Sequence, residues 1–229
     1  MILALMVAAV TLAQAKTLVV YYSFTNNTKT IVNDLLTQID ADVLEVLPAE
    51  EGLDYAANNY AIGSALISAI RENPNDAASY PAIKTTIDNL SDYSTVIVAT
   101  PLWWSNMAAP MQTFLFTYGA QMAGKNIGLI VSSASSGISG VESDAKRLIP
   151  QGNFFSSSLW IRSSQTSNCH SLIAEWLNDI NYDNVSAITE LNADAAAQDD
   201  TYYDLSGRVV SNPTKGIYIH GGKKIFLLK

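Results

Sequence analysis

Hydrophobic and polar residues alternate along this chain in blocks that predict strands separated by helices. Residues 18–22 form an apolar run of β-branched and aromatic residues, and residues 31–39 then place apolar side chains at helical spacing. Later blocks predict strands at 43–47, 95–100, 127–131 and 153–161. They also predict helices near 55–70, 81–90 and 111–118, a helix that ends at Leu148, and a last helix at 172–180 that follows an Asn168 cap. Five strands with intervening helices predict an α/β fold, a doubly wound five-stranded parallel sheet with helices on both faces.

Three of the predicted connections follow the carboxyl ends of strands and differ from ordinary loops. Residues 23–28 are rich in hydroxyl and amide groups and precede a helix, whose N-terminus favours an anion such as phosphate; an ordinary turn with a Thr or Asn cap is the alternative. Residues 101–106 carry two adjacent Trp side chains, which suit a planar ligand or the core. Residues 132–140 are rich in Ser and Gly, and such small residues let the backbone approach a planar ring closely. Because ligands bind at this edge of such sheets, the three loops together suit flavin mononucleotide, FMN.

The composition bounds the size of the core and the kinds of partner. Of 229 residues, 48% are hydrophobic and 15% charged, so the chain can bury one sizeable core and a small appendage. A formal net charge of −8 argues against nucleic acid or an anionic membrane as partner. With Cys169 as the single cysteine, neither a disulfide framework nor a cysteine metal cluster is available. Cys169 beside His170 is interpreted as a packed thiol next to a surface imidazole, and no catalytic residue or metal site is predicted.

The first residues have the pattern of a signal peptide. Residues 1–15 are an apolar run that ends in Ala13-Gln14-Ala15, an A-x-A cleavage pattern, although no Lys or Arg precedes the apolar core. The run is too short to span a membrane. We therefore expect cleavage after Ala15, a periplasmic or secreted protein, and no transmembrane span in the mature chain.

The last residues predict a small β module. A polar, Ala-rich linker at 186–200 is followed by strand-like pieces at 202–205, 216–219 and 224–228, separated by Ser-Gly and Gly-Gly turns. Residues 201–229 carry five basic and one acidic side chain, opposite in sign to the rest of the chain. The tail resembles the C-terminal segments of exported Bacteroidetes proteins, and this resemblance implies contact with secretion machinery.

The body of the chain, expected to form a domain over residues 16–185, resembles a known family. The SFTNNT run is similar to the phosphate loop of flavodoxins, and TPLWW with Pro110 and Phe114 is similar to the strand, loop and helix that carry their ring-stacking tryptophan. Residues 17–180 therefore resemble the flavodoxin-like FMN-binding family. Asn26 or Asn27 stands where the family usually has Gly, and Asn tolerates positive φ better than most residues. The loop after the fourth strand lacks the Tyr that stacks on the ring in many flavodoxins.

Carried over to this sequence, the resemblance implies a set of FMN contacts. The phosphate would be held by Ser23, Thr25, Asn26, Asn27 and Thr28; the ring would lie against Pro101, Leu102, Trp103, Trp104, Ser105 and Asn106; its pyrimidine side would be lined by Ser132, Ser133, Ser136 and Gly137. Trp103 is favoured over Trp104 as the stacking residue.

The predicted function is noncovalent FMN binding and electron transfer to a redox partner protein or a small acceptor. The alternative is an FMN-dependent NAD(P)H:quinone oxidoreductase, because Thr100-Pro101 with Asn106-Met107-Ala108-Ala109 is similar to a run of that class. A binding module that keeps the fold without the flavin is the third possibility.

Overall fold

A computed structural model describes residues 16–182, 202–204, 208–211, 213–220 and 223–227. The described residues up to 182 form one compact unit, and those from 202 onwards belong to another. The signal peptide predicted at 1–15 and the linker predicted at 186–200 lie outside the described residues. None of the helices in the described ranges has both the length and the apolar character that a membrane span requires.

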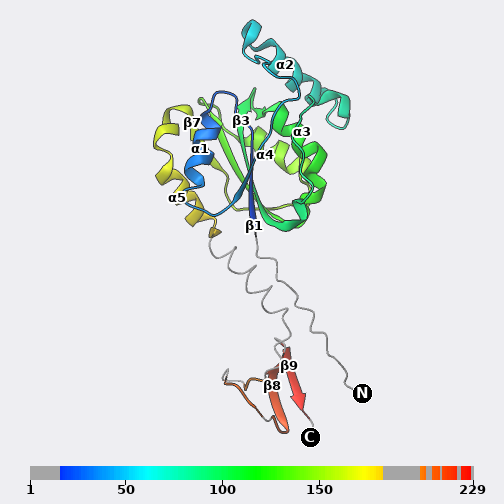
Figure 1. Ribbon diagram of the computed structural model, residues 1–229, viewed down its shortest axis with the longest axis vertical. Coiled ribbons are helices and arrows are strands. Elements are labelled where there is room, and N and C mark those ends of the chain that lie inside the picture. The colour runs from blue at the N-terminus through cyan, green and yellow to red at the C-terminus, as the bar shows by residue number, and fades with distance from the viewer. Residues whose placement is uncertain (1–15, 183–201, 205–207, 212, 221–222, 228–229) are drawn as a thin grey trace, which may run out of the picture. The chain divides into compact units, whose positions relative to one another are not determined.

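The larger unit is built on a parallel sheet with strand order β2-β1-β3-β5-β6 (Figure 1). The strands are β1 (Lys16–Tyr21), β2 (Asp42–Glu45), β3 (Tyr93–Trp103), β5 (Asn126–Ser133), β6 (Asn153–Phe154) and β7 (Leu159–Arg162), and both β6 and β7 pair with β5. This order, with β1 between β2 and β3, is one of the two common doubly wound arrangements and confirms the predicted fold class.

Helices cover both faces of this sheet because consecutive strand residues point to opposite faces. Val19 packs on the side of α1 (Asn27–Leu35) and α5 (His170–Asp179), whereas Val20 packs on the side of α3 (Ala109–Tyr118) and α4 (Ser139–Leu148). The remaining helical elements are α2 (Ala57–Glu72) and the short 3₁₀ helices η1 (Ala77–Ser79), η2 (Leu90–Asp92), η3 (Gly119–Met122) and η4 (Ser163–Asn168).

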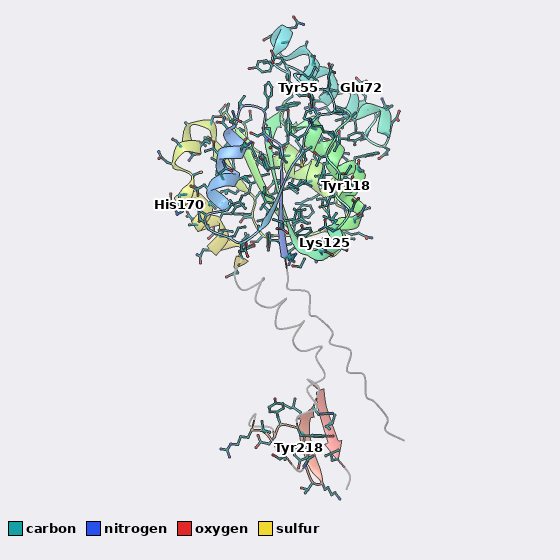
Figure 2. The ribbon with its side chains drawn as sticks, in the orientation of Figure 1. Tyr55, Glu72, Tyr118, Lys125, His170 and Tyr218 are labelled. Carbon is teal, nitrogen blue, oxygen red and sulfur yellow. The ribbon has the colours of Figure 1, made fainter. Side chains whose placement is uncertain are left out.

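α2 lies at the carboxyl edge of the sheet. Figure 2 places Tyr55 and Glu72, near the two ends of α2, at the end of the sheet away from Lys125, which directly precedes β5. The regular part of α2 begins only after Asn58, Asn59 and Tyr60, because these three residues have positive φ.

Three predicted elements are wrong in detail. Residues 81–90 do not form a helix. Pro48 and Ile83 form a β-bridge instead, and Ile83 packs against the buried hydrophobic core on the side of α3 and α4. The fifth strand is interrupted at residues 155–158, which separate β6 from β7. Asn168 does not cap the last helix, because it ends η4, and the N-cap of α5 is Cys169.

The C-terminal unit contains a hairpin of β8 (Gly216–His220) and β9 (Lys223–Leu227). Tyr203 forms isolated bridges with Val209 and Ile219. In the described part of the piece predicted as a strand at 202–205, Tyr203 therefore forms isolated bridges and no regular strand.

Candidate functional site

The loop between β1 and α1 has the backbone conformation of a tight helix entry. Asn26 is the N-cap of α1 with φ 64° and ψ −5°, a left-handed conformation that Asn tolerates. Ser23 Oγ accepts a hydrogen bond from the Lys29 N–H at 3.2 Å, which closes the loop on the first turn of the helix. Thr25 and Asn26 are exposed. The loop therefore presents hydroxyl and amide groups to solvent beside the positive end of the helix dipole.

The same loop is tied to the loop after β5. Thr28 is 1% exposed, and its Oγ1 shares a 2.8 Å hydrogen bond with Ser132 Oγ. Asn27 Nδ2 lies 3.4 Å from Ser163 Oγ. Lys29 is the only cation in residues 23–29, and its Nζ lies 3.5 Å from Glu45 Oε2 on β2. Thr28 and Asn27 thus join the first predicted loop to the third one and to η4.

The second predicted loop is a tight hairpin. β3 runs on to Trp103 and turns back into β4 (Asn106–Met107), so that Trp103 pairs with Asn106. Trp104 (φ 46°) and Ser105 (φ 66°) form the turn. A two-residue turn with both φ values positive usually contains Asn or Gly, and a left-handed conformation costs other residues roughly 1–2 kcal/mol each. Neighbouring segments must therefore hold this turn in place.

The two tryptophans have different surroundings, although they are adjacent in sequence. Trp103 is half-buried, with ring centroids of Tyr55, Tyr22 and Phe24 at 5.0, 5.7 and 6.2 Å. Trp104 is 40% exposed at the tip of the hairpin. The packing favours a structural role for Trp103, and the Trp104 indole is the more open of the two rings.

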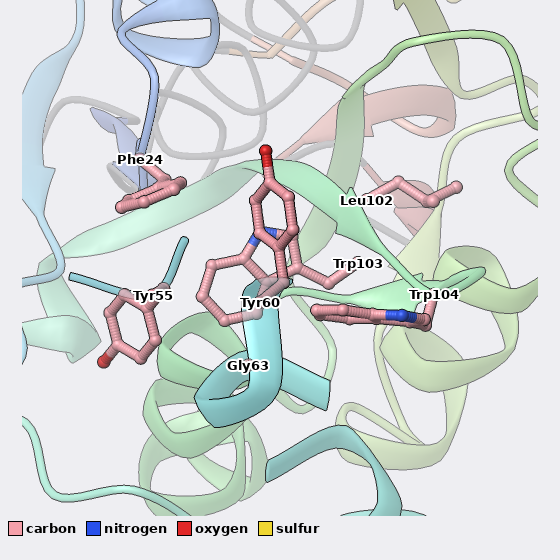
Figure 3. Close-up of a pocket in the computed structure, with 7 residues that line it drawn as sticks. All are labelled: Phe24, Tyr55, Tyr60, Gly63, Leu102, Trp103 and Trp104. Carbon is pink, nitrogen blue, oxygen red and sulfur yellow. The ribbon is translucent and has the colours of Figure 1, made fainter. Parts of the chain in front are cut away.

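A cavity of about 320 Å³ opens between these aromatic rings (Figure 3). It is lined by Phe24, Tyr55, Tyr60, Gly63, Leu102, Trp103 and Trp104. The last three are predicted site residues, whereas the first four are absent from the sequence prediction. The sequence signals that could have indicated them are weak: Phe24 interrupts the polar SFTNNT run, and Gly63 is a glycine inside a helix. Tyr55 and Tyr60 belong to a segment whose docking on the hairpin only the fold reveals.

The third loop uses part of its polar groups internally. Ser132 and Ser133 are buried, and Ser133 Oγ accepts from Trp160 Nε1 at 2.8 Å and donates to the Ser136 carbonyl at 3.0 Å. Ser136 and Gly137 are exposed. Ser132 and Ser133 therefore hold the loop together, while Ser136 and Gly137 form its open surface.

A second cavity, of about 300 Å³, adjoins the aromatic one and contains carboxylates. Phe24 and Tyr55 line both cavities, and Glu45, Glu50 and Glu51 line the second. The described residues contain no cluster of His, Cys, Asp and Glu that could hold a metal ion.

Cys169 and His170 do not face each other as a nucleophile and a base. Cys169 is buried, and burial raises the pKa of its thiol. The His170 Nδ1 lies 2.9 Å from Asp34 Oδ1 on α1. The structure thus supports the interpretation of Cys169 as a packing residue.

The fold is that of a doubly wound α/β protein, and the three loops converge at the carboxyl edge of its sheet, where such folds bind their ligands. The flavodoxin family model matches residues 16–180, and the chain belongs to the flavodoxin family. No curated protein matches it.

Solved structures share this fold. A proposed flavoprotein from Bacteroides eggerthii is 24% identical, with TM-score 0.58 over 73% of this chain and 98% of that chain. A second one, from Bacteroides uniformis, is 23% identical, with TM-score 0.56 over 72% and 98%. A flavoprotein in complex with FMN from Lactobacillus acidophilus is 20% identical, with TM-score 0.53 over 69% and 99%.

Proposed function

We propose that this protein binds FMN noncovalently and transfers electrons. The observation that carries the proposal is the convergence of three loops at the carboxyl edge of the sheet, through the Thr28–Ser132 hydrogen bond and the Phe24–Trp103 contact. Flavodoxin membership supports FMN as the ligand, as does the FMN bound by the Lactobacillus acidophilus protein.

The groups at this edge fit the chemistry of FMN. The exposed Thr25 and Asn26 side chains, with the N-terminal N–H groups of α1, would donate to the phosphate. The Trp104 indole would offer a stacking surface, and the exposed Gly137 backbone would approach the ring edge. The flavin supplies the redox chemistry when bound, and the chain binds it, orients it and limits its contact with water.

An absorption titration tests this proposal. Purified protein with added FMN should show perturbed bands of oxidised flavin that stay with the protein through gel filtration. Riboflavin, which lacks the phosphate, should bind more weakly. If FMN elutes entirely free of the protein, the chain keeps the fold as a binding module without flavin, and the proposal is wrong.

A quinone reductase is the second candidate function. The aromatic cavity is lined by uncharged side chains, which suit a planar apolar acceptor, and Asn106 and Met107 belong to the run that resembles this enzyme class. Steady-state oxidation of NADH or NADPH by the FMN-loaded protein, with and without a quinone, separates the two functions. Turnover that depends on the quinone supports the enzyme, whereas its absence supports a carrier that exchanges electrons with a partner protein.

Export of the protein is a separate proposal, supported by the apolar run and the Ala13-Gln14-Ala15 pattern in residues 1–15. Residues 201–229 are the candidate segment for contact with secretion machinery. N-terminal sequencing of protein from an extracytoplasmic fraction should show Lys16 first. Recovery of the chain with Met1 intact in the cytoplasm alone would contradict export.

A further inference from the structure

Arg71 holds the Trp104–Ser105 turn from one side. Arg71 is the second-last residue of α2 and is exposed. Its Nη2 donates to the Trp104 carbonyl oxygen at 2.5 Å, and its Nε donates to Asn106 Oδ1 at 2.7 Å. One guanidinium therefore bonds to the residues on both sides of Ser105. Because this group is a rigid planar fork, the two bonds fix the orientation of the turn as well as its distance from α2.

The other side of the turn rests on α4. Asp144 Oδ2 accepts from Asn106 Nδ2 at 2.9 Å and from the Met107 N–H at 3.0 Å. Gly140, in the first turn of α4, lies so close that a Cβ atom there would overlap the Ser105 carbonyl oxygen. The turn is thus clamped between two helices, and Arg71 supplies the α2 half of the clamp.

α2 also supports the Trp104 ring. A Cβ added to Gly63 would lie 3.0 Å from Trp104 Cζ3, so the indole lies directly on the helix backbone. One helix therefore holds the carbonyl group of Trp104 through Arg71 and its ring through Gly63. Among the ion pairs of the described residues none includes Arg71, so bonding to the turn accounts for its placement.

We propose that Arg71 is a positioning residue for the flavin ring, acting through Trp104. Without the fork, only the α4 half of the clamp holds the left-handed Trp104 and Ser105. The turn then shifts toward ordinary backbone conformations, and the indole leaves the orientation that stacking requires. Loss of Arg71 therefore weakens the contact with the flavin ring and leaves the phosphate loop unchanged. This inference rests on the proposed FMN site.

Substitution of Arg71 by Lys tests the role, because Lys keeps the charge and most of the length but cannot form the planar two-bond fork. The dissociation constants of FMN and riboflavin are measured by flavin fluorescence for the parent, Arg71→Lys and the neighbouring control Glu72→Gln. Arg71→Lys should raise the dissociation constants of both ligands by the same factor, about tenfold, as expected for the loss of one charge-assisted hydrogen bond. Glu72→Gln should bind both as the parent does.

The outcomes separate this role from the proposed function. If Arg71→Lys binds both ligands as tightly as the parent, the positioning role is wrong and the FMN site stands. If the parent binds neither ligand, the proposed function fails, and the positioning role fails with it. Should Arg71→Lys melt far below the parent, Arg71→Gln is the second variant, because its side-chain N–H takes the place of the Arg71 Nε donor to Asn106, whereas the donor to the Trp104 carbonyl is removed. Unchanged affinity in that variant also overturns the role.

Discussion

The Thr28 and Ser132 hydroxyls share a buried 2.8 Å hydrogen bond although 104 residues separate them in the chain. Thr28 lies in the first turn of α1, and Ser132 is the second-last residue of β5. The bond joins two of the three predicted loops. It also means that the Thr28 side chain, predicted as a phosphate donor, already has a partner within the protein.

Removal of this bond should lower the stability of the protein. Thr28→Val leaves the buried Ser132 hydroxyl unpaired, which costs about 1–3 kcal/mol in the free energy of unfolding, whereas adding Ser132→Ala should recover part of the loss. Urea unfolding of the two single variants and the double variant measures their coupling. Thr30→Val, on the exposed face of α1, is the matched control. Strictly additive effects would show that the two hydroxyls do not interact.

The exposed part of the first loop should control phosphate recognition. Replacing Thr25 by Ala and Asn26 by Gly in one variant removes two side-chain donors. Gly can still adopt the left-handed conformation that residue 26 has. Each charge-assisted bond contributes about 1.5–3 kcal/mol before non-additivity, so FMN affinity should fall and riboflavin affinity should not. Titration with both ligands measures the difference. Equal losses for the two ligands would place the phosphate elsewhere.

The two tryptophans should respond differently to substitution. Trp103→Ala should lower the free energy of unfolding by about 3 kcal/mol, because it empties the space between Tyr22, Phe24 and Tyr55. Trp104→Ala should lower melting less than Trp103→Ala does, because the Trp104 ring is 40% exposed, and should weaken flavin binding by about 0.5–1.5 kcal/mol, the contribution of a stacking contact. Thermal melts and flavin titrations measure both effects. The reverse result would return the stacking role to Trp103, the residue that the sequence alone favours.

Tyr21 should make the protein less stable in strong alkali. Burial, followed by the neighbouring Glu45, raises the pKa of Tyr21 to about 12. In the unfolded chain a tyrosine ionises near pH ~10. The contribution of Tyr21 to stability is therefore complete below pH ~10 and is lost as the pH rises through about 12.

A comparison of variants isolates this contribution. Urea unfolding between pH ~9 and ~12 should show a shallower decline for Tyr21→Phe than for the parent, because Phe cannot ionise. Tyr60→Phe, at a half-exposed ring, serves as the control. Identical slopes for the parent and Tyr21→Phe would contradict the role of Tyr21.

The sequence determined the doubly wound sheet and the loops that carry the site. Apolar runs such as residues 18–22 and helical spacing such as residues 31–39 depend on near neighbours in the chain, so local pattern was sufficient to predict them. Segments with weak patterns were predicted less well: residues 81–90 have apolar positions that suit a helix, but Pro48 pairs with Ile83 in a bridge. Long-range pairing there overrides local preference.

Only the tertiary structure decided which side chains share the site. Packing brings together segments far apart in the chain, and no local pattern records that Tyr55 lies on Trp103 or that Thr28 bonds to Ser132. The same holds for the hairpin turn: Trp104 and Ser105 carry no turn signal, and their left-handed backbone exists because Arg71 and Gly140 approach it from two helices. Sequence thus placed the loops at one edge of the sheet, and the contacts between distant segments decided which residues face a ligand and which hold the fold.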